Sequence, residues 1–251
     1  MVLDLDGCVY VGAEAVPGAR EALEAVAAAG CEVIFATNNS TKTREAVAER
    51  LREITGFGVG PDRIVTSARA AAGILTDADD PVLPIGESGL VAAIMDAGFQ
   101  VTEDPDRARS VVVGLDRAIS YDRIRRAAHA AILGARYIAT NHDPTFPTSG
   151  VPAPGSGSIV AAVERASGRA AEFAGKPHPP MLAAIEAILG SGDTWMVGDR
   201  PDTDIACGNR AGWTTVLVRT GVAPDPDSLE GEQRPDHVLD TVAGLPGLLG
   251  L

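Results

Sequence analysis

The sequence predicts an α/β fold in which a parallel sheet carries helices on both faces. One observation is a short apolar strand, Val2–Leu5, that runs into a turn at Gly7. Another is Gly18–Ala29, which has Ala and Leu at helical spacing and stops at Gly30, as helices often do. A third is the buried, β-branched and aromatic strand Glu32–Ala36. Regular alternation of strands and helices is typical of a parallel sheet.

The same alternation continues along the chain. A Pro- and Gly-rich stretch from Thr140 to Gly157 interrupts it, and such a long loop is uncommon in a compact domain unless it binds something. We expect two crossings between domains, at Asp77–Pro81 and at Gly168–Glu172. The remaining expected strands are Val82–Ile85, Val101–Thr102, Ser110–Val113, Arg136–Ala139, Thr194–Val197 and Thr214–Val218, and the helices are Thr43–Leu51, Gly89–Ala97, Tyr121–Leu133, Ser158–Ala166 and Met181–Leu189.

Composition excludes several classes of protein. The 251 residues are 45% hydrophobic and 22% charged, which is ordinary for a globular protein. The formal net charge of −13 repels nucleic acid and anionic lipid, so neither is an expected partner. The three cysteines are widely spaced, which argues against a disulfide framework or a zinc site. No signal peptide and no apolar run of ~18 residues is found, so we expect a cytoplasmic protein.

The first candidate site segment is Asp4-Leu5-Asp6-Gly7, at the end of the first strand. Alternation along an extended chain puts Asp4 and Asp6 on one side, with Cα atoms about 6–7 Å apart. Two such carboxylates can divide the work, one attacking phosphorus and the other moving protons. The alternative is a solvated acidic turn. The preceding apolar run favours function, because an unpaired buried charge is costly.

Two further segments supply hydrogen-bond donors and a cation. Thr37-Asn38-Asn39 directly follows a strand and suits phosphoryl oxygens, although Asn39 or Ser40 as a helix cap is the simpler alternative. Gly175-Lys176-Pro177 fixes the direction of one of only two lysines, which can neutralise a phosphate or an aspartate. A solvent-facing lysine is the alternative there.

The fourth segment, Trp195–Asp204, is the most specific. Asp199, Asp202 and Asp204 lie within six residues, directly after a buried strand. Packing them without a cation would be self-repulsive, and Mg²⁺ prefers carboxylate oxygens. In an open α/β sheet, ligands bind beyond the carboxyl ends of the strands, so the four segments are expected to converge.

These motifs, in this order, resemble those of the haloacid dehalogenase superfamily. The similarity spans essentially the whole chain, and longer segments resemble the NagD-like subfamily, which includes p-nitrophenyl phosphatases. Those segments are Asp4-x-Asp6, Ala36-Thr37-Asn38-Asn39-Ser40, Val113-Gly114-Leu115-Asp116, Thr140-Asn141-x-Asp143, Gly175-Lys176-Pro177 and Gly198-Asp199-Arg200-x-x-Thr203-Asp204-Ile205.

The resemblance implies a Rossmann-like core and roles for its acidic residues and lysine. Asp4 would be the nucleophile and a Mg²⁺ ligand. Asp6 would protonate the leaving oxygen, activate water and offer its backbone carbonyl to the metal. Lys176 would balance charge and Asp199 would ligate Mg²⁺. Asp204 would lie close to the metal ion, next to the residues that are its direct ligands.

The resemblance also implies an α/β cap that selects the substrate. The core would comprise residues 1–79 and 171–251, and the cap residues 80–170. Thr37, Asn38 and Asn39 would hold the phosphoryl group. Asn141 and His142, in the cap loop, would contact the substrate. The helix Tyr121–Leu133 presents a face that is either core or, as in related caps, a homodimer surface.

Two departures from the family pattern stand out. Only three residues precede Asp4, so either the first strand is short or a few residues are missing before it. Phe146 stands near the position where pyridoxal phosphatases carry a histidine, which argues against vitamin B6 phosphate as the substrate.

The expected function is Mg²⁺-dependent hydrolysis of small phosphate monoesters through a phosphoaspartyl intermediate. Phosphoglycolate, glycerol 3-phosphate, sugar phosphates and p-nitrophenyl phosphate are the candidate substrates, with pyridoxal phosphate and nucleotides as alternatives. Two other functions are a phosphomutase that uses the same aspartate and a binding protein that has lost turnover. A nicotinamide-dependent enzyme is disfavoured, because no G-x-G-x-x-G follows the first strand.

Overall fold

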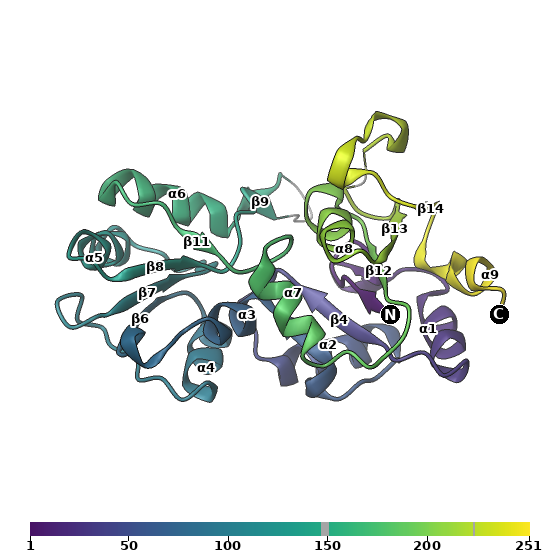
Figure 1. The fold of residues 1–251 in the computed structure, drawn as a ribbon, viewed down its shortest axis with the longest axis horizontal. Helices are drawn as coiled ribbons and strands as arrows, with labels where there is room; N and C mark the ends of the chain where they lie inside the picture. The colour runs from purple at the N-terminus through teal and green to yellow at the C-terminus, as the bar shows by residue number, and fades with distance from the viewer. Residues whose placement is uncertain (147–150, 223) are drawn as a thin grey trace. The chain divides into compact units, whose positions relative to one another are not determined.

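The chain folds into two compact units, described here one at a time (Figure 1). The computed structural model describes residues 1–146, 151–222 and 224–251. The first unit comprises Met1–Thr37, Arg44–Val65 and Ile185–Leu251, and the second comprises Asn38–Thr43 and Thr66–Ala184. These units are defined by packing, and the core and cap limits expected from the sequence stay a prediction.

The first unit is built on a six-stranded sheet in the order β14-β13-β12-β1-β4-β5, parallel at every pair from β14 to β4. The first strand lies between β12 and β4, with Leu3 opposite Val197 on one side and Phe35 on the other. The strands are β1 (Val2–Leu3), β4 (Ile34–Thr37), β5 (Ile64–Thr66), β12 (Trp195–Gly198), β13 (Thr214–Val218) and β14 (His237–Leu239), with a separate hairpin of β2 (Tyr10–Val11) and β3 (Glu14–Ala15).

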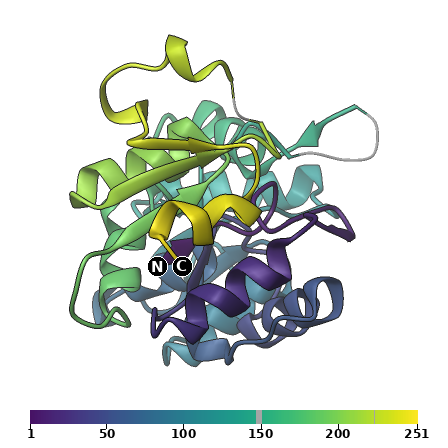
Figure 2. The same cartoon turned by 90° about the vertical axis from the view of Figure 1, so that its right-hand side faces the viewer.

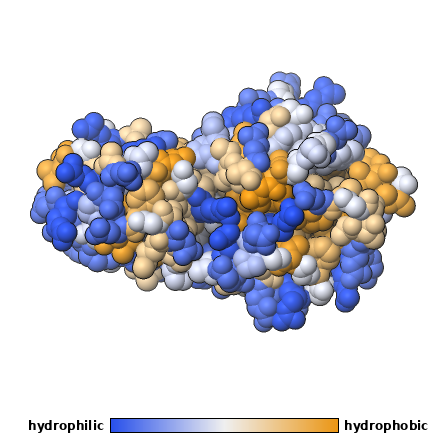
Figure 3. Space-filling view, turned by 60° about the horizontal axis from the view of Figure 1, so that its bottom comes forward, coloured by the Kyte–Doolittle hydropathy of each residue, from blue (hydrophilic) through white to orange (hydrophobic). Residues whose placement is uncertain are grey.

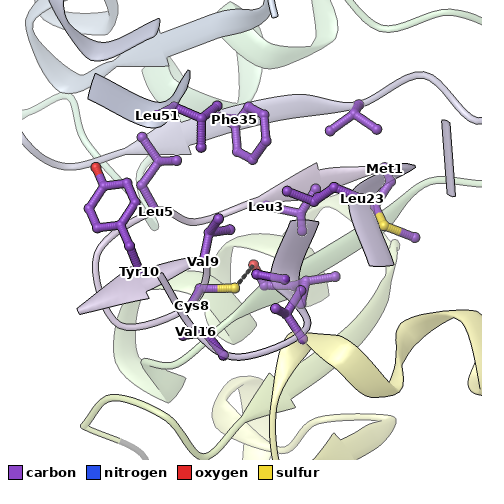
Figure 4. Packing of buried hydrophobic residues seen from close by; sticks show 14 of the residues in the cluster. Met1, Leu3, Leu5, Cys8, Val9, Tyr10, Val16, Leu23, Phe35 and Leu51 are labelled. Carbon is purple, nitrogen blue, oxygen red and sulfur yellow. Dashed lines mark hydrogen bonds between the residues drawn. The ribbon is translucent and has the colours of Figure 1, made fainter. Parts of the chain in front are cut away.

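Helices cover this sheet and complete the hydrophobic core of the first unit. Figure 2 shows α1, in purple, beside the C-terminal helix α9, in yellow. Leu3, Leu5, Leu23 and Phe35 are fully buried in one cluster, in which the Cys8 thiol also contacts the Val197 carbonyl (Figure 4). The helices are α1 (Ala19–Ala28), α2 (Arg44–Thr55), α8 (Ala206–Ala211) and α9 (Leu245–Leu249), with a π-helical turn η3 (Pro201–Ile205) and the 3₁₀ turns η1 (Pro61–Arg63), η4 (Pro226–Ser228), η5 (Gly231–Gln233) and η6 (Val242–Gly244).

The second unit has its own four-stranded parallel sheet in the order β11-β8-β7-β6. Alternate residues such as Leu83 and Val111 pack against Ala127 of α5 and Val160 of α6. The elements are α3 (Ser67–Gly73), η2 (Asp77–Asp79), β6 (Val82–Ile85), α4 (Ser88–Asp96), β7 (Ser110–Val113), α5 (Tyr121–Ile132), β8 (Arg136–Ala139), the hairpin of β9 (Thr145–Phe146) and β10 (Ala153–Pro154), α6 (Ser156–Ser167) and β11 (Glu172–Phe173), followed by α7 (Pro179–Glu186), which leads into the first unit.

The predicted α/β class with parallel sheets is confirmed, and the differences lie in the short elements. The expected strand Val101–Thr102 is wrong, because Val101 makes only an isolated bridge to Val82. Elements that were not predicted from the sequence include β5, α3 and β14. Strands of three residues are too short for alternation to be visible. The long loop from Thr140 to Gly157 contains β9 and β10, and its residues 147–150 lie outside the described residues.

Among the described residues, no helix is long and apolar enough to cross a membrane. On the face drawn in Figure 3, hydrophobic patches alternate with hydrophilic residues. The cytoplasmic location expected from the sequence stays a prediction.

Candidate active site

Three buried carboxylates meet beyond the carboxyl ends of two neighbouring strands of the first unit. Asp4 follows β1, Asp199 follows β12, and the Asp4 N–H donates to the Val197 carbonyl at 2.8 Å. Because β1 and β12 are paired and parallel, their ends bring these two residues side by side. Asp204 joins them, and one carboxylate oxygen from each of the three lies within 4.8 Å of the others.

The π-helical turn Pro201–Ile205 carries Asp204 back toward the strand that precedes it. The Asp204 N–H donates to the Arg200 carbonyl at 2.8 Å, and the Arg200 N–H donates to Asp204 Oδ2 at 3.0 Å. This reciprocal pair fixes both the main chain and the carboxylate. Asp202 instead points to solvent, where it pairs with the Arg200 guanidinium. Of the three aspartates in this segment, Asp199 and Asp204 therefore belong to the cluster.

Gly7 allows Asp199 to approach the loop after β1. Its φ of 94° lies in the left-handed region that favours glycine. A Cβ atom at this position would lie 2.6 Å from Asp199 Oδ2, which is closer than real contacts allow. On the other side, Asp199 Oδ2 accepts a hydrogen bond from the Val222 N–H at 2.8 Å. The glycine of the D-x-D-G motif is thus required both by its backbone conformation and by a neighbour.

The donor set fits a hard divalent cation. Asp4, Asp199 and Asp204 are 7%, 1% and 1% exposed, and they offer only oxygen atoms. Three like charges this close in a buried setting repel one another, and a bound cation removes that repulsion. Mg²⁺ prefers carboxylate oxygens, so these residues would hold it.

Asp6 is exposed and stands outside this group of three, although its chain segment is ordered by a bridge to Tyr10. The regular strand ends at Leu3, and the roles of Asp6 expected from the sequence stay predictions. Burial raises the pKa of the Tyr10 phenol well above its usual range, and the nearby Asp6 and Asp4 carboxylates raise it further. Tyr10 therefore stays protonated beside the two acids.

Thr37 is the last residue of β4, the neighbour of β1 on the side opposite β12, and it is buried. Asn39 is exposed, and its side-chain oxygen accepts hydrogen bonds from the N–H (2.9 Å) and the hydroxyl (2.7 Å) of Thr41. This contact is a local turn and caps no helix, because the next helix, α2, begins only at Arg44. The roles of both residues in phosphate binding stay predictions.

In the second unit, the Asn38 side chain holds the main chain of Lys176. Asn38 Oδ1 accepts from the Lys176 N–H at 2.8 Å, and Asn38 Nδ2 donates to the Lys176 carbonyl at 3.2 Å. The amide group thus satisfies both main-chain groups of one residue, as a neighbouring strand would. Lys176 is 1% exposed, so the alternative of a solvent-facing lysine is wrong.

Asn38 is itself held by three other side chains. The Ser67 hydroxyl (2.6 Å) and Asn141 Nδ2 (2.7 Å) both donate to its main-chain carbonyl. Asp143 Oδ2 also accepts from Asn38 Nδ2 at 3.4 Å. Asn141, which the sequence analysis assigned to the substrate, therefore contributes to this network. Asp143 was not singled out as a site residue, although it stands in the Thr140-Asn141-x-Asp143 segment.

Asn38→Ala is expected to lower the free energy of unfolding by about 2–4 kcal/mol, because two buried main-chain groups of Lys176 lose their partner. Asn38→Asp keeps the acceptor for the Lys176 N–H but sets an oxygen against the Lys176 carbonyl, so it is expected to destabilise as well. Urea denaturation measures both variants. The control is Asn39→Ala, which removes only a local turn and is expected to cost about 1 kcal/mol. Equal losses in the free energy of unfolding for the Asn38 and Asn39 variants would contradict the role of Asn38 as a partner of the Lys176 main chain.

His142 belongs to a ring cluster in the second unit. Its centroid lies 5.6 Å from that of Phe173 and 5.5 Å from that of His178, both in edge-to-face geometry. Phe173 and His178 are stacked at 5.4 Å. All three residues are half-buried. His142 therefore has a packing role, and its contact with substrate stays a prediction.

Two residues in contact with the acidic site could not be found from the sequence. Val222 acts through its main-chain N–H, which every residue except proline carries. The Thr220 hydroxyl donates to the Gly7 carbonyl at 2.6 Å. A threonine after a strand is too common to predict such a contact.

Comparisons with known proteins find similarity to hydrolases over most of the chain. The model of the haloacid dehalogenase-like hydrolases matches residues 1–100, and a second model, described as HAD-hydrolase-like, matches residues 173–245. An acid sugar phosphatase from Staphylococcus haemolyticus is 35% identical over 94% of this chain and 90% of its own length. A dihydroxyacetone phosphatase from Corynebacterium glutamicum is 36% identical over 96% of this chain and 88% of its own.

Solved structures give the same result over nearly the whole chain. A p-nitrophenyl phosphatase from Archaeoglobus fulgidus has a TM-score of 0.90 at 33% identity, covering 98% of this chain and 97% of its own. A glycerol phosphate phosphatase from Mycobacterium tuberculosis in complex with magnesium has a TM-score of 0.88 at 34% identity, covering 97% and 75%. NagD from E. coli K-12 has a TM-score of 0.86 at 33% identity, covering 96% of each chain.

The chain belongs to the haloacid dehalogenase-like hydrolase family. Its similarity to NagD and to the p-nitrophenyl phosphatases assigns it to the NagD-like group of that family. The resemblance found in the motifs is thereby confirmed.

Proposed function

We propose that this protein is a Mg²⁺-dependent phosphatase that hydrolyses small phosphate monoesters through a phosphoaspartyl intermediate on Asp4. The observation that carries the proposal is the meeting of Asp4, Asp199 and Asp204 in one buried cluster. A nucleophile next to a cation site is what phosphoryl transfer requires, because the repulsion between an anionic nucleophile and an anionic substrate must be offset. Relatives of this chain are named as phosphatases of small esters.

The reaction we propose has two displacements. An Asp4 carboxylate oxygen forms a bond to phosphorus as the bond from phosphorus to the ester oxygen breaks, and Asp6 gives its proton to that leaving oxygen. Asp6, now a carboxylate, takes a proton from water, whose oxygen attacks phosphorus and releases phosphate from Asp4. Mg²⁺ would neutralise the phosphoryl oxygens in both steps. Thr37, Asn38 and Asn39 would hold the phosphoryl group, and Lys176 would balance charge.

Each proposed role rests on a feature of the residue concerned. Asp6 is exposed, so water can reach its carboxylate for the second displacement. Lys176 is buried and its main chain is fixed, which suits a cation that must keep one position. These roles place the proton transfers on Asp6 and the covalent chemistry on Asp4.

The proposal is tested by incubating the purified protein and Mg²⁺ with a panel of phosphate monoesters. Release of inorganic phosphate, with trapping of a phosphorylated Asp4 peptide after acid quenching, is the expected result. A phosphomutase would instead return the phosphoryl group to the substrate and release little phosphate. Failure to hydrolyse any ester in the panel would favour the binding-protein alternative.

For the substrate, we propose three-carbon phosphates and sugar phosphates as the preferred class. Three relatives are named as an acid sugar phosphatase, a dihydroxyacetone phosphatase and a glycerol phosphate phosphatase. Phe146 is half-buried in β9, near the position where pyridoxal phosphatases carry a histidine, which argues against pyridoxal phosphate. The panel should therefore include glycerol 3-phosphate, dihydroxyacetone phosphate, phosphoglycolate, p-nitrophenyl phosphate, pyridoxal phosphate and nucleoside monophosphates.

We also propose that the protein forms a homodimer through α5. Tyr121, Ile132 and Leu133 are 84%, 56% and 60% exposed, which is unusual for large hydrophobic side chains gathered at one helix. Sedimentation equilibrium is expected to show a dimer, and the double variant Tyr121→Glu/Ile132→Glu is expected to shift it to monomer. A monomeric wild type would exclude this assembly.

A further inference from the structure

The segment Thr220–Val222 contacts two separate parts of the acidic site. It follows β13, which is paired with β12, so it leaves the sheet beside the strand that carries Asp199. Two of its three residues donate a hydrogen bond to the site segments, and the third passes close to one of the carboxylates.

Its first contact holds the loop after Asp4 and Asp6. The Thr220 hydroxyl donates to the Gly7 carbonyl at 2.6 Å, and the Gly7 N–H donates to the Tyr10 carbonyl at 2.8 Å. Gly7 is therefore held through both of its main-chain groups. Because Gly7 touches Asp199 and follows Asp6 directly, a shift of this residue would move both acids.

Its second contact orients the Asp199 carboxylate. The Val222 N–H donates to Asp199 Oδ2, the same oxygen that Gly7 approaches. A Cβ at position 221 would overlap this oxygen as well, so the main chain at Gly221 lies directly against it. Asp199 Oδ2 is thus enclosed by main chain from two loops, which restricts rotation of the carboxylate about its Cβ–Cγ bond.

We propose that Thr220–Val222 is a positioning segment that sets the orientation of Asp199 and the loop of Asp4 and Asp6 for binding of Mg²⁺. This inference rests on the proposed function, in which Asp199 is a ligand of the ion. The segment acts through Gly7 and Asp199 and needs no contact with substrate. Groups that orient metal ligands in this way set metal affinity, and their loss commonly weakens it about 10–100-fold.

The test measures Mg²⁺ binding directly, by calorimetry on the substrate-free protein, and kcat and KM for an ester that the wild type hydrolyses. Thr220→Val removes the hydroxyl at almost constant volume and is expected to weaken Mg²⁺ binding about tenfold. At saturating Mg²⁺, its KM for the ester is expected to stay within about twofold of the wild-type value, because the substitution removes no contact with the substrate. Thr220→Ser keeps the hydroxyl and is expected to restore the affinity.

Gly221→Ala is the second variant, in which the added methyl group pushes against Asp199 Oδ2 and is expected to weaken Mg²⁺ binding at least as much as Thr220→Val. Thr194→Val and Gly247→Ala are the matched controls, because Thr194 lies at the opposite end of β12 and Gly247 has open space where its Cβ would be. Circular dichroism confirms folding, and Thr220→Val decides the matter if Gly221→Ala does not fold.

Wild-type Mg²⁺ affinity in Thr220→Val, or equal weakening in Thr220→Ser, would overturn the inference. Absence of Mg²⁺ binding by the wild-type protein is a different result, which would overturn the proposed function itself. The two failures are therefore distinguishable.

Discussion

Replacing Asp4 with asparagine is expected to lower kcat by about 10⁴-fold or more, because the amide cannot act as the attacking nucleophile. The side chains have nearly the same size, and the main-chain hydrogen bond from Asp4 to Val197 is unchanged by the substitution. The variant is therefore expected to stay folded. Steady-state phosphate release measures the loss, and near- and far-ultraviolet circular dichroism checks the fold.

Asp193→Asn is the matched control for this experiment. Asp193 is an exposed acid of the same unit, a few residues before β12, and it undergoes the same chemical change. Its kcat is expected to stay close to that of the wild type. A second check is acid-quench trapping, in which Asp4→Asn should yield no phosphorylated peptide. Substantial turnover in Asp4→Asn would exclude covalent catalysis at this position.

Removing divalent metal is the second change expected to have a large effect. Dialysis against EDTA should abolish phosphate release, and added Mg²⁺ should restore it, because the buried carboxylates of Asp4, Asp199 and Asp204 then again share a cation. Binding to the folded state also stabilises it by mass action, by about 2.7 kcal/mol when Mg²⁺ stands at 100 times its Kd. The melting temperature is therefore expected to rise with Mg²⁺ concentration.

Asp199→Asn separates this site from metal bound elsewhere. The variant is expected to lose both the activity and most of the Mg²⁺-dependent rise in melting temperature, while Asp202→Asn, in the exposed acid of the same segment, should keep both. Full activity of the wild type in EDTA, with no metal found by mass spectrometry, would contradict the assignment of Mg²⁺.

The sequence was sufficient to predict the α/β class, the central strands and the acidic cluster. Strands such as Val82–Ile85 and Ser110–Val113 have the predicted limits, because each short, largely apolar run ends at a glycine, Gly86 or Gly114. Asp4 and Asp199 meet because each follows one of two adjacent parallel strands, whose carboxyl ends lie at one edge of the sheet.

What the sequence could not predict depends on contacts between distant segments. The hydrogen bonds of Asn38 to the main chain of Lys176 join residues 138 positions apart, and no local pattern indicates such a pairing. The π-helical turn that returns Asp204 to Asp199 likewise leaves no periodic signal in five residues.

Two hydrogen bonds to the acidic cluster come from the peptide groups of Arg200 and Val222, whose side chains play no part in them. Mutation can vary those side chains widely without touching the interaction, since only proline lacks the donor. Gly7 and Gly221 are the opposite case, because a single added carbon atom at either one collides with Asp199. In a mutational scan of this chain, we expect tolerance to differ sharply between adjacent positions. Substitutions at position 221 should lower activity, whereas position 222 should accept most residues except proline.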